Sequence, residues 1–517
     1  MIRLFNSLTQ SKEQFEPRDA GKAGIYCCGP TVYNLLHIGN ARPYVTFAVL
    51  KSWLERRDFD TTLVTNITDV DDKIITKANA EGRSPAEVAE EFTRAYVTDT
   101  DRLGIARPDV EPRATETIPE IVDLVCQLIS RGHAYEAGGS VYFRVRSFDG
   151  YGKLSRQRIE ELEEGARVEG DPGKEDPLDF AVWKAAKPGE PAWESPWGMG
   201  RPGWHIECSA MGLRYLGAGF DVHGGGRDLI FPHHENEIAQ AEAAGLPFAR
   251  VWMHNGMIRS EGEKMAKSVG NIFLLREVLD RYEPAVVLMY FLTTHYRSPL
   301  EFSTEKLDEA KAAYGKLGDA FADLDFRIAN AGKAPRQGTS PEVGARAETA
   351  RVSFTEHMDD DLNTAAAIGE LFSLVGDTYR YLSAVDRGDA PLDESGLADV
   401  RAVLAECLEV LLIPVPRSAI EPDGRIAGVE SPESCATGVV LLPSAERLAE
   451  QGHWSDVELL YADRLACRDA SYACVLRDHY RAEKRWAEAD RLRDEIQAAG
   501  FEVRDTKMGT QVVSRDS

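Results

Sequence analysis

The chain has 517 residues, of which 43% are hydrophobic and 28% are charged, and its net charge is −25. This length predicts roughly three or four domains with a sizeable core, and the composition is that of a globular protein. The negative charge repels nucleic acids at long range, so composition alone argues against RNA binding except through a local basic or stacking surface.

Neither a membrane span nor a disulfide framework is predicted. The chain has no run of 18 or more apolar residues, and its first residues lack the apolar core and cleavage site of a secretory signal. The eight cysteines are scattered, at positions 27, 28, 126, 208, 407, 435, 467 and 474. In a chain of this kind they are better interpreted as reduced thiols or metal ligands, so we expect a cytoplasmic protein.

The stretch Gly24–Asn40 predicts a strand, a turn and the start of a helix. The apolar run 25–28 is typical of a buried strand, and Gly29-Pro30 ends it as a turn. Helical spacing follows from Ala41, with Pro43 in the first turn. Free N–H groups and the positive end of the helix dipole, beside His37 and Asn40, would attract an anion. An ordinary strand–turn–helix connection remains the alternative.

The next elements continue an alternating α/β pattern. Residues 61–65 predict a strand, and residues 66–73 lead into a helix with Thr68 or Asp69 as its N-cap. The aspartates at 69, 71 and 72 suit either a hard-cation site or a capped, solvated helix start. A helix from Ser84 to Leu103 should begin with a capping box formed by Ser84 and Glu87.

Residues 114–202 have the pattern of an insertion. It is expected to hold a helix at 118–131, a strand pair around 139–144 and an acidic stretch at 160–176. Beyond it, strand and helix signals return at 204–209, with a strand into a glycine turn at 221–226 and a helix at 228–244. The sequence therefore predicts one doubly wound α/β domain, split into residues 1–113 and 203–302.

The C-terminal part is predicted to be mostly helical. Helices at 285–292, 303–327, 340–358 and 364–384 fit an antiparallel bundle over residues 303–413. Residues 414–455 are rich in Pro, Gly and Ser and predict a linker. Residues 456–517 predict a small domain of helices followed by two strands.

Four side chains form a possible metal-binding set. His233 and Glu237 lie four positions apart on the predicted helix and so share a face. Together with the thiolates of Cys28 and Cys208 they would supply the four ligands of a zinc site. Because side chains alternate along a strand, only one of Cys27 and Cys28 can point to the site. On this reasoning Cys27 and His234 remain competing ligands, and buried cysteines without metal remain the simpler alternative.

A second pattern is Lys264-Met-Ala-Lys267-Ser268, which lies between Gly262 and Gly270. Two lysines on a glycine-bounded loop can close over a triphosphate and stabilise its developing charge. A lone Lys-x-x-Lys is more often a solvated surface.

Taken together, these patterns resemble the class I aminoacyl-tRNA synthetases. His37-Ile-Gly-Asn40 resembles their HIGH signature, and residues 264–268 resemble their KMSKS signature. Within that class the chain resembles the cysteinyl-tRNA synthetases. The motifs that carry this resemblance are Cys28-Gly-Pro-Thr-Val-Tyr33, Asn66-Ile-Thr-Asp-Val-Asp-Asp-Lys73, Gly203-Trp-His-Ile-Glu-Cys-Ser-Ala-Met211, His223-Gly-Gly-Gly226 and Phe231-Pro-His-His-Glu-Asn-Glu-Ile-Ala-Gln240.

The resemblance implies a fold and a reaction. The fold is a split Rossmann-like (HUP-type) catalytic domain with an insertion, followed by an α-helical bundle and a small C-terminal anticodon-binding domain. The reaction activates L-cysteine with ATP and Mg²⁺, releases pyrophosphate, and transfers the cysteine to tRNA(Cys). A monomer is implied as well. The alternatives are a cysteine:amino-sugar ligase of mycothiol biosynthesis and a non-catalytic regulatory paralogue.

The resemblance also implies roles for particular residues. It selects Cys28, Cys208, His233 and Glu237 as ligands of one Zn²⁺ that binds the substrate thiolate. His37, Asn40 and Lys267 would contact ATP, with Lys264 in support, and Trp204 would pack on the bound amino acid. Arg481, Trp486, Asp490 and Asp505 would read the anticodon, although Trp486 and Trp204 can also be read as core residues. Asn40 and Ala266 depart from the signatures, and neither change removes a lysine.

Overall fold

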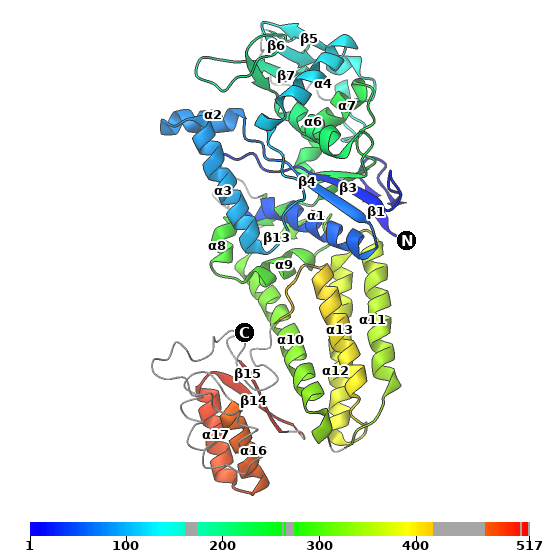
Figure 1. Ribbon diagram of the computed structural model, residues 1–517, viewed down its shortest axis with the longest axis vertical. Coiled ribbons are helices and arrows are strands. Elements are labelled where there is room, and N and C mark those ends of the chain that lie inside the picture. Colours follow the sequence, from blue (N-terminus) through cyan, green and yellow to red (C-terminus); the bar gives the residue numbers. More distant parts are fainter. Residues whose placement is uncertain are drawn as a thin grey trace. The chain divides into compact units, whose positions relative to one another are not determined.

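In the computed structural model, the strand predicted near Ile25 belongs to a four-stranded parallel sheet with strand order β10-β9-β3-β4. Figure 1 shows two of these strands, β3 and β4, close to α1. Helix α1 connects β3 to β4, and helices α6 and α7 accompany β9 and β10. The bounds are β3 Lys22–Cys27, β4 Asp60–Thr65, β9 Val222–Gly226, β10 Val251–Asn255, α1 Ile38–Arg56, α6 Trp204–Leu216 and α7 Glu235–Ala243. The predicted doubly wound α/β arrangement is therefore present.

The structure describes residues 1–160, 173–260, 263–264, 273–334, 336–416, 471–506 and 509–514. The chain divides into two compact units. The first comprises Met1–Asp308, Glu356–Ala366 and Val410–Leu412, and the second comprises Glu309–Thr355, Ala367–Glu409 and Ile413–Ser517. In the described ranges, no helix is both long and apolar enough to cross a membrane.

Two helices follow β4, and their starts are capped differently. Helix α3, Pro85–Leu103, begins with the predicted capping box of Ser84 and Glu87. Helix α2, Asp72–Glu81, is capped by Asp71, whose carboxylate accepts a hydrogen bond from the Lys73 N–H at 2.8 Å. The prediction of Thr68 or Asp69 as N-cap is therefore wrong, because Asp69 accepts hydrogen bonds from Thr115 instead.

The insertion forms an antiparallel sheet with strand order β5-β6-β7-β8, covered by helix α4. The bounds are α4 Ile118–Ser130, β5 Ala134–Ala137, β6 Ser140–Phe143, β7 Phe180–Ala185 and β8 Gly200–Pro202. The predicted helix and strand pair are confirmed. Most of the acidic stretch lies outside the described residues.

The helix predicted over 228–244 is interrupted. Short helical turns span Arg227–Leu229 and Ile230–His234, and Phe231, within the second of them, is extended, with φ −135° and ψ 134°. Pro232 follows Phe231, and the ring of a proline disfavours helical backbone at the residue before it. Regular helix therefore begins only at Glu235.

The remaining described elements of the first unit are short. They are β1 Arg3–Asn6, β2 Ser11–Gln14, β11 Ile258–Ser260, β12 Glu263–Lys264, β13 Leu300–Glu301, α8 Leu275–Leu279, α9 Pro284–Leu292, and the 3-10 turns Ala114–Glu116 and Val145–Ser147. Strand β11 pairs with both β12 and β13.

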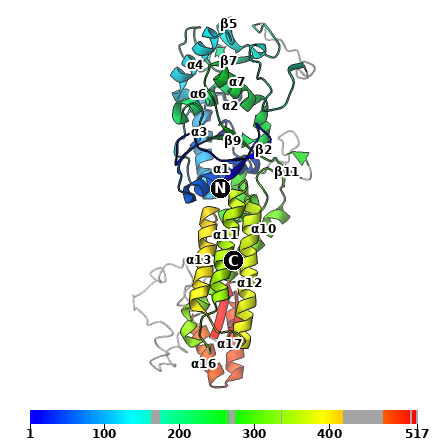
Figure 2. The same ribbon diagram turned by 90° about the vertical axis from the view of Figure 1, so that its right-hand side faces the viewer.

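Helices α10 to α13 run side by side, which fits the predicted bundle (Figure 2). Their bounds are α10 Thr304–Ala329, α11 Pro341–Asp359, α12 Thr364–Arg387 and α13 Glu394–Val410. Ion pairs join them, for example Arg327 with Asp386 at 2.7 Å and Arg346 with Glu370 at 2.8 Å. Three of the helices were predicted individually, and α13 was not.

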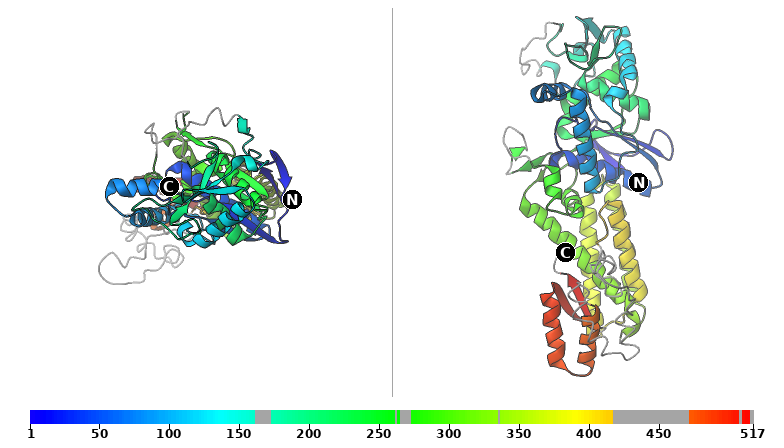
Figure 3. Two further views of the ribbon diagram at one scale, coloured as in Figure 1. Left: turned by 90° about the horizontal axis from the view of Figure 1, so that it is seen from above. Right: turned by 60° about the vertical axis from the view of Figure 1, so that its left-hand side comes forward.

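The second unit also holds two adjacent helices and a β-hairpin near the C-terminus (Figure 3). Helices α16 Ser471–Ala482 and α17 Trp486–Ala498 precede β14 Phe501–Thr506 and β15 Gly509–Ser514, which pair antiparallel. The predicted order of helix and strand is confirmed there. Residues 417–470, including nearly all of the predicted linker, lie outside the described residues.

Candidate active site

The four predicted metal ligands come together although three separate segments carry them. Cys28 follows the end of β3, Cys208 lies on α6, and His233 and Glu237 lie just before and within α7. Their ligand atoms all lie within 4.8 Å of one another, and all four side chains are buried. The parallel sheet and its connecting helices bring the three segments together, because the carboxyl ends of parallel strands meet at one edge of the sheet.

The spacing of this group fits a tetrahedral zinc site. The Cys28 and Cys208 sulfurs are 4.0 Å apart, far beyond a disulfide bond. Two sulfurs that each lie about 2.3 Å from a tetrahedral zinc would be roughly 3.8 Å apart. Glu237 Oε1 lies 3.8 Å from the Cys28 sulfur and 2.9 Å from His233 Nε2. The donor set of two thiols, one imidazole and one carboxylate is therefore suited to zinc.

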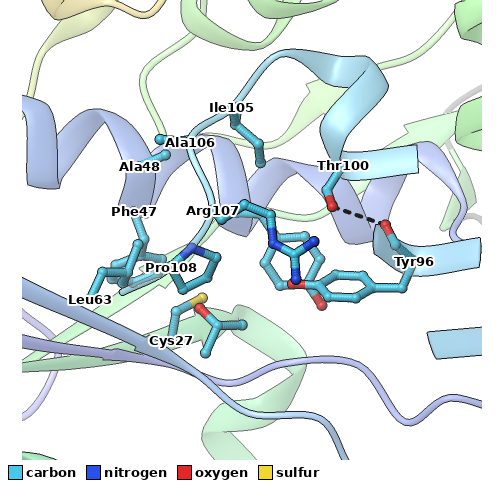
Figure 4. A pocket seen from close by; sticks show the side chains of 12 residues that line it. Cys27, Phe47, Ala48, Leu63, Tyr96, Thr100, Ile105, Ala106, Arg107 and Pro108 are labelled. Carbon is cyan, nitrogen blue, oxygen red and sulfur yellow. Dashed lines mark hydrogen bonds between the residues drawn. The ribbon is translucent and has the colours of Figure 1, made fainter. Parts of the chain in front are cut away.

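Cys27 is separated from this group. Its side chain lines a cavity of about 20 Å³, roughly the size of one water molecule, together with side chains of α1 and α3 (Figure 4). Cys28 instead lies in a buried cluster with Cys208. Alternation along the strand thus gives the two cysteines different surroundings, as predicted.

A second, overlapping group shares two members with the first. It consists of Cys28, His223, His234 and Glu237, and its ligand atoms also lie within 4.8 Å of one another. His234 Nε2 is 3.3 Å from the Cys28 sulfur, and His223 Nε2 is 3.2 Å from Glu237 Oε2. Only the first group contains a second thiol, the ligand that zinc favours most over water.

His223 was not singled out from the sequence as a possible ligand or ligand partner. A histidine near the start of β9, directly before three glycines, was the available signal. Its neighbour across the sheet could be assigned only from the strand register, in which it pairs with Tyr26.

Without a metal ion, protons balance the negative charges of this group. Burial opposes ionisation of Glu237, but the neighbouring His223 and His233 lower its pKa to about 2. Burial likewise opposes a charged His233, but Glu237 and Cys208 raise its pKa to about 10. The hydrogen bond from Cys28 lowers the pKa of Cys208 to about 6. A divalent cation would replace the protons that hold these groups together.

An aromatic layer covers one side of the group. The ring of Trp204 stacks on His233 at 4.3 Å between centroids, and His205 Nδ1 lies 2.9 Å from His233 Nδ1. The Lys73 ammonium lies 5.7 Å from the centroid of Trp204 and 5.4 Å from that of Tyr33. Trp204 is half-buried, so it is not a core residue. Lys73 beside it was not singled out from the sequence.

The turn after Cys28 is held tightly by the segment after β4. The Gly29 N–H donates to Asn66 Oδ1 at 2.9 Å, and a β-carbon on Gly29 would lie 1.6 Å from the Asn66 carbonyl oxygen. No side chain fits at that distance, so the glycine is required by space rather than by backbone angle.

We therefore expect Gly29→Ala to lower the free energy of unfolding by about 3 kcal/mol or more, because the two backbone segments must separate. Cys28 would move with the turn, so zinc content should fall as well. Thermal unfolding and metal analysis test this, with Gly369→Ala as control, since a β-carbon on Gly369 meets no atom within 4 Å. Parental stability and zinc content in Gly29→Ala would contradict the expectation.

The start of α1 lies beside both ends of the lysine loop. His37 is the N-cap of α1, and its N–H donates to Asn40 Oδ1 at 3.3 Å. The Ile38 N–H donates to the Phe273 carbonyl at 2.9 Å, and Ile258 at the start of β11 approaches Gly39. The backbone of Lys264 lies in β12, whereas Lys267 lies outside the described residues. The described residues that flank the second signature, Ile258 and Phe273, thus lie beside the first.

The residues predicted to read an anticodon lie in the second unit. Trp486 is 58% exposed, which excludes it as a core residue of the small domain. Arg481 donates to Asp505 at 2.9 Å, and the buried Arg477 also pairs with Asp505. Asp490 is exposed on α17. Trp486 and Asp490 are thus open to solvent, whereas Arg481 and Asp505 engage each other.

Comparison with known proteins agrees with this geometry. A family model described as the tRNA synthetases class I (C) catalytic domain matches residues 14–312. The cysteine–tRNA ligase of Carboxydothermus hydrogenoformans is 45% identical over 513 residues, which cover 99% of each chain. The chain belongs to the cysteine–tRNA ligase family. A second member, from Caldicellulosiruptor saccharolyticus, is 42% identical over 512 residues, again covering 99% of both chains.

Two further matches bear on the architecture of this family member. A DALR domain model matches residues 353–413, within the helices predicted as a bundle, and this domain was not identified from the sequence. Among solved structures, a Mycobacterium tuberculosis methionyl-tRNA synthetase in complex with methionyl-adenylate aligns with a TM-score of 0.58 at 18% identity. The alignment covers 82% of this chain and 97% of that one, and it supports a class I synthetase fold.

Proposed function

We propose that this chain activates L-cysteine with ATP, releases pyrophosphate and transfers the cysteine to the 3′ end of tRNA(Cys). The observation that carries the proposal is the buried group of Cys28, Cys208, His233 and Glu237, with Cys28 in the connection between β3 and α1. A soft metal site of this composition suits recognition of a thiol, and a helix N-terminus suits an anion.

The four ligands would hold one Zn²⁺, which when bound prefers sulfur to oxygen ligands and stabilises a thiolate. Cysteine and serine differ by one atom, and pocket shape alone separates side chains that differ so little by only about 10–200-fold. The ligand set would therefore exclude serine without an editing site. Trp204, stacked on His233, would cover the bound amino acid and keep water from it.

Residues at the other side of the turn would bind ATP with Mg²⁺. His37 and Asn40, at the start of α1, would contact its phosphates, and Lys267 with Lys264 would stabilise charge on the departing pyrophosphate. The carboxylate of cysteine is already ionised at neutral pH, so no general base is needed. Catalysis would then consist of positioning and electrostatic stabilisation.

The helical bundle and the C-terminal domain would bind the tRNA. We assign the catalytic domain to residues 1–113 and 203–302, the insertion to 114–202, the helical bundle to 303–413, a linker to 414–455, and anticodon binding to 456–517. Trp486 would stack on an unpaired base, with Arg481, Asp490 and Asp505 nearby to contact base edges.

We further propose that the protein acts as a monomer in the cytoplasm. Light scattering at working concentrations tests whether it is a monomer.

The exposed ring of Trp486 gives a direct test of the tRNA interaction. Stacking on one base contributes about 1–3 kcal/mol, so Trp486→Ala should reduce kcat/KM for tRNA by about 5–150-fold. Trp486→Phe keeps an aromatic face and should retain most of the activity. ATP–pyrophosphate exchange, which needs no anticodon contact, should be unchanged in both variants. Charging by Trp486→Ala at the parental efficiency would refute this role.

The two alternatives make different predictions. A cysteine:amino-sugar ligase would catalyse cysteine-dependent ATP–pyrophosphate exchange but would charge no tRNA, and a non-catalytic paralogue would do neither. The relatives above span this chain nearly end to end and are named as tRNA ligases, so we favour the ligase. Exchange without charging would overturn the proposal.

A further inference from the structure

A buried arginine lies near the start of α1, the helix that His37 caps. Arg42 is 1% exposed, and its guanidinium donates hydrogen bonds to three carbonyl oxygens. Nη1 donates to those of Gly256 and Ser298, both at 2.7 Å, and Nη2 donates to that of His295 at 3.1 Å. All three acceptors are main-chain atoms, so this side chain holds backbone rather than another side chain.

The position of Arg42 is a costly one for a charged group. Among the described residues no carboxylate pairs with it, and its Nε has no hydrogen-bond partner there. Burial lowers the pKa of Arg42 to about 10, so the group is still charged at neutral pH. Carbonyl dipoles offset only part of the cost of burying a charge, and an apolar side chain of similar size avoids that cost. Orientation of the segments it holds therefore accounts for an arginine here better than stability does.

The three carbonyls belong to two segments that touch each other. Gly256 lies between β10 and β11, and His295 and Ser298 lie between α9 and β13. The Gly256 N–H donates to the Tyr296 carbonyl at 2.8 Å, and a β-carbon on Gly256 would lie 2.2 Å from the Ser298 carbonyl oxygen. The two backbones are thus in direct contact, and the guanidinium joins both of them to α1.

These two segments lead into the small sheet that carries Lys264. Strand β11 pairs with β13 on one side and with β12, which contains Lys264, on the other. Gly256 precedes β11 and Ser298 precedes β13, so their carbonyls lie where this sheet begins. Arg42 therefore connects the base of the sheet to the helix that starts beside His37.

We propose that Arg42 is a positioning residue for adenylate formation, which holds the sheet of β11, β12 and β13 in place against the start of α1. The inference rests on the proposed function, in which His37 and Lys264 both act on the triphosphate of ATP. The spacing between these two residues then enters the rate of the chemical step. A misplacement of about 1 Å can lower such a rate by about 100-fold. Arg42 would act on it through backbone and would touch neither substrate.

The test is Arg42→Met, which keeps the length of the side chain and removes its donors. Adenylate formation is measured in single turnovers at varied cysteine concentration, together with zinc content. We expect its rate constant to fall about 100-fold, with KM for cysteine and zinc content at parental values, because Arg42 makes no contact with the metal-binding group. Arg42→Lys keeps the charge but replaces the planar fork of donors, so it should lose less.

The control for loss of a buried arginine is Arg327→Met. Arg327 lies in α10 and pairs with Asp323 and Asp386. Its removal should lower Tm and leave the rate constant for adenylate formation unchanged.

A double-mutant cycle separates positioning from a general structural role. If Arg42 acts by placing β12, then Arg42→Met should cost at least about twofold less in a Lys264→Ala background than in the parent. An equal cost in both backgrounds, or a folded Arg42→Met with the parental rate, would overturn the inference and leave the proposed function intact. If Arg42→Met does not fold, the rates of Arg42→Lys decide on the same criteria. A parent that forms no adenylate from cysteine overturns both.

Discussion

Cys208→Ala is expected to lose stoichiometric zinc and, with it, cysteine-dependent ATP–pyrophosphate exchange. Cys208 supplies one of the two sulfurs of the proposed site, and its removal leaves three ligands in a fully buried space. Loss of an indirect ligand contact alone costs about 10–100-fold in metal affinity, so loss of a ligand should exceed about 100-fold. Metal analysis of the purified protein, followed by the exchange assay, measures both effects.

Cys27→Ala is the matched control for this substitution. It also removes a buried thiol, but Cys27 lies in the cavity lined by α1 and α3 and outside the metal-binding group. Its zinc content and exchange rate should equal those of the parent. Undiminished zinc in Cys208→Ala would contradict the ligand assignment and would favour the overlapping group of Cys28, His223, His234 and Glu237.

Lys267→Ala is expected to reduce kcat for adenylate formation by about 10²–10³-fold, the usual effect of removing one preorganised charge-stabilising group. KM for cysteine should change little, because the amino acid is held at the metal-binding group. The backbone supports this role. After the loop, the Leu275 N–H donates a hydrogen bond to the carbonyl of Leu36, the residue before His37, at 2.9 Å. Pre-steady-state measurement of adenylate formation separates the chemical step from binding.

Two variants calibrate the Lys267 result. Lys264→Ala should have a smaller effect, because that lysine is assigned a supporting role. Lys187→Ala, which removes an exposed lysine of the insertion, should have none. A fall in affinity for cysteine with an unchanged kcat in Lys267→Ala would assign the loop to amino-acid binding and contradict the proposed role in pyrophosphate departure.

Local signals predicted much of the fold. The apolar run of β3 and the break at Gly29-Pro30 were sufficient to predict the strand and the turn, because each depends on nearest neighbours. Pro43, predicted in the first helical turn, lies inside α1 instead. The helix nevertheless begins at Ile38, earlier than the apolar spacing from Ala41 indicated. The contact between His37 and Asn40 caps the helix at this earlier position. Polar capping residues give no signal in the hydrophobic periodicity from which the start was judged.

Other features were beyond local reasoning. The helix predicted through 228–244 is broken at Phe231, and the following proline was a signal that the helical spacing of apolar residues obscured. Asp69, Asp71 and Asp72 looked like one cluster, yet Asp69 binds Thr115, Asp71 caps α2, and Asp72 pairs with Lys184 and Arg201. Neighbours in sequence are separated here by contacts to distant segments.

The candidate site shows the same division. Residue chemistry was enough to propose thiols, an imidazole and a carboxylate, but no spacing links Cys28 to Cys208. Resemblance to a family selected the four residues, and the parallel sheet brings them together. Tyr26 and His223 could not be paired in advance, because their contact depends on the register between two strands far apart in the chain.

The most direct test of the account is aminoacylation of total tRNA by the zinc-loaded and zinc-depleted protein, with each amino acid supplied in turn. The account predicts that the loaded protein charges tRNA with cysteine and not with serine. Charging should be lost on zinc depletion and restored when Zn²⁺ is added back. Charging with a different amino acid, or cysteine charging that is indifferent to zinc, would contradict it.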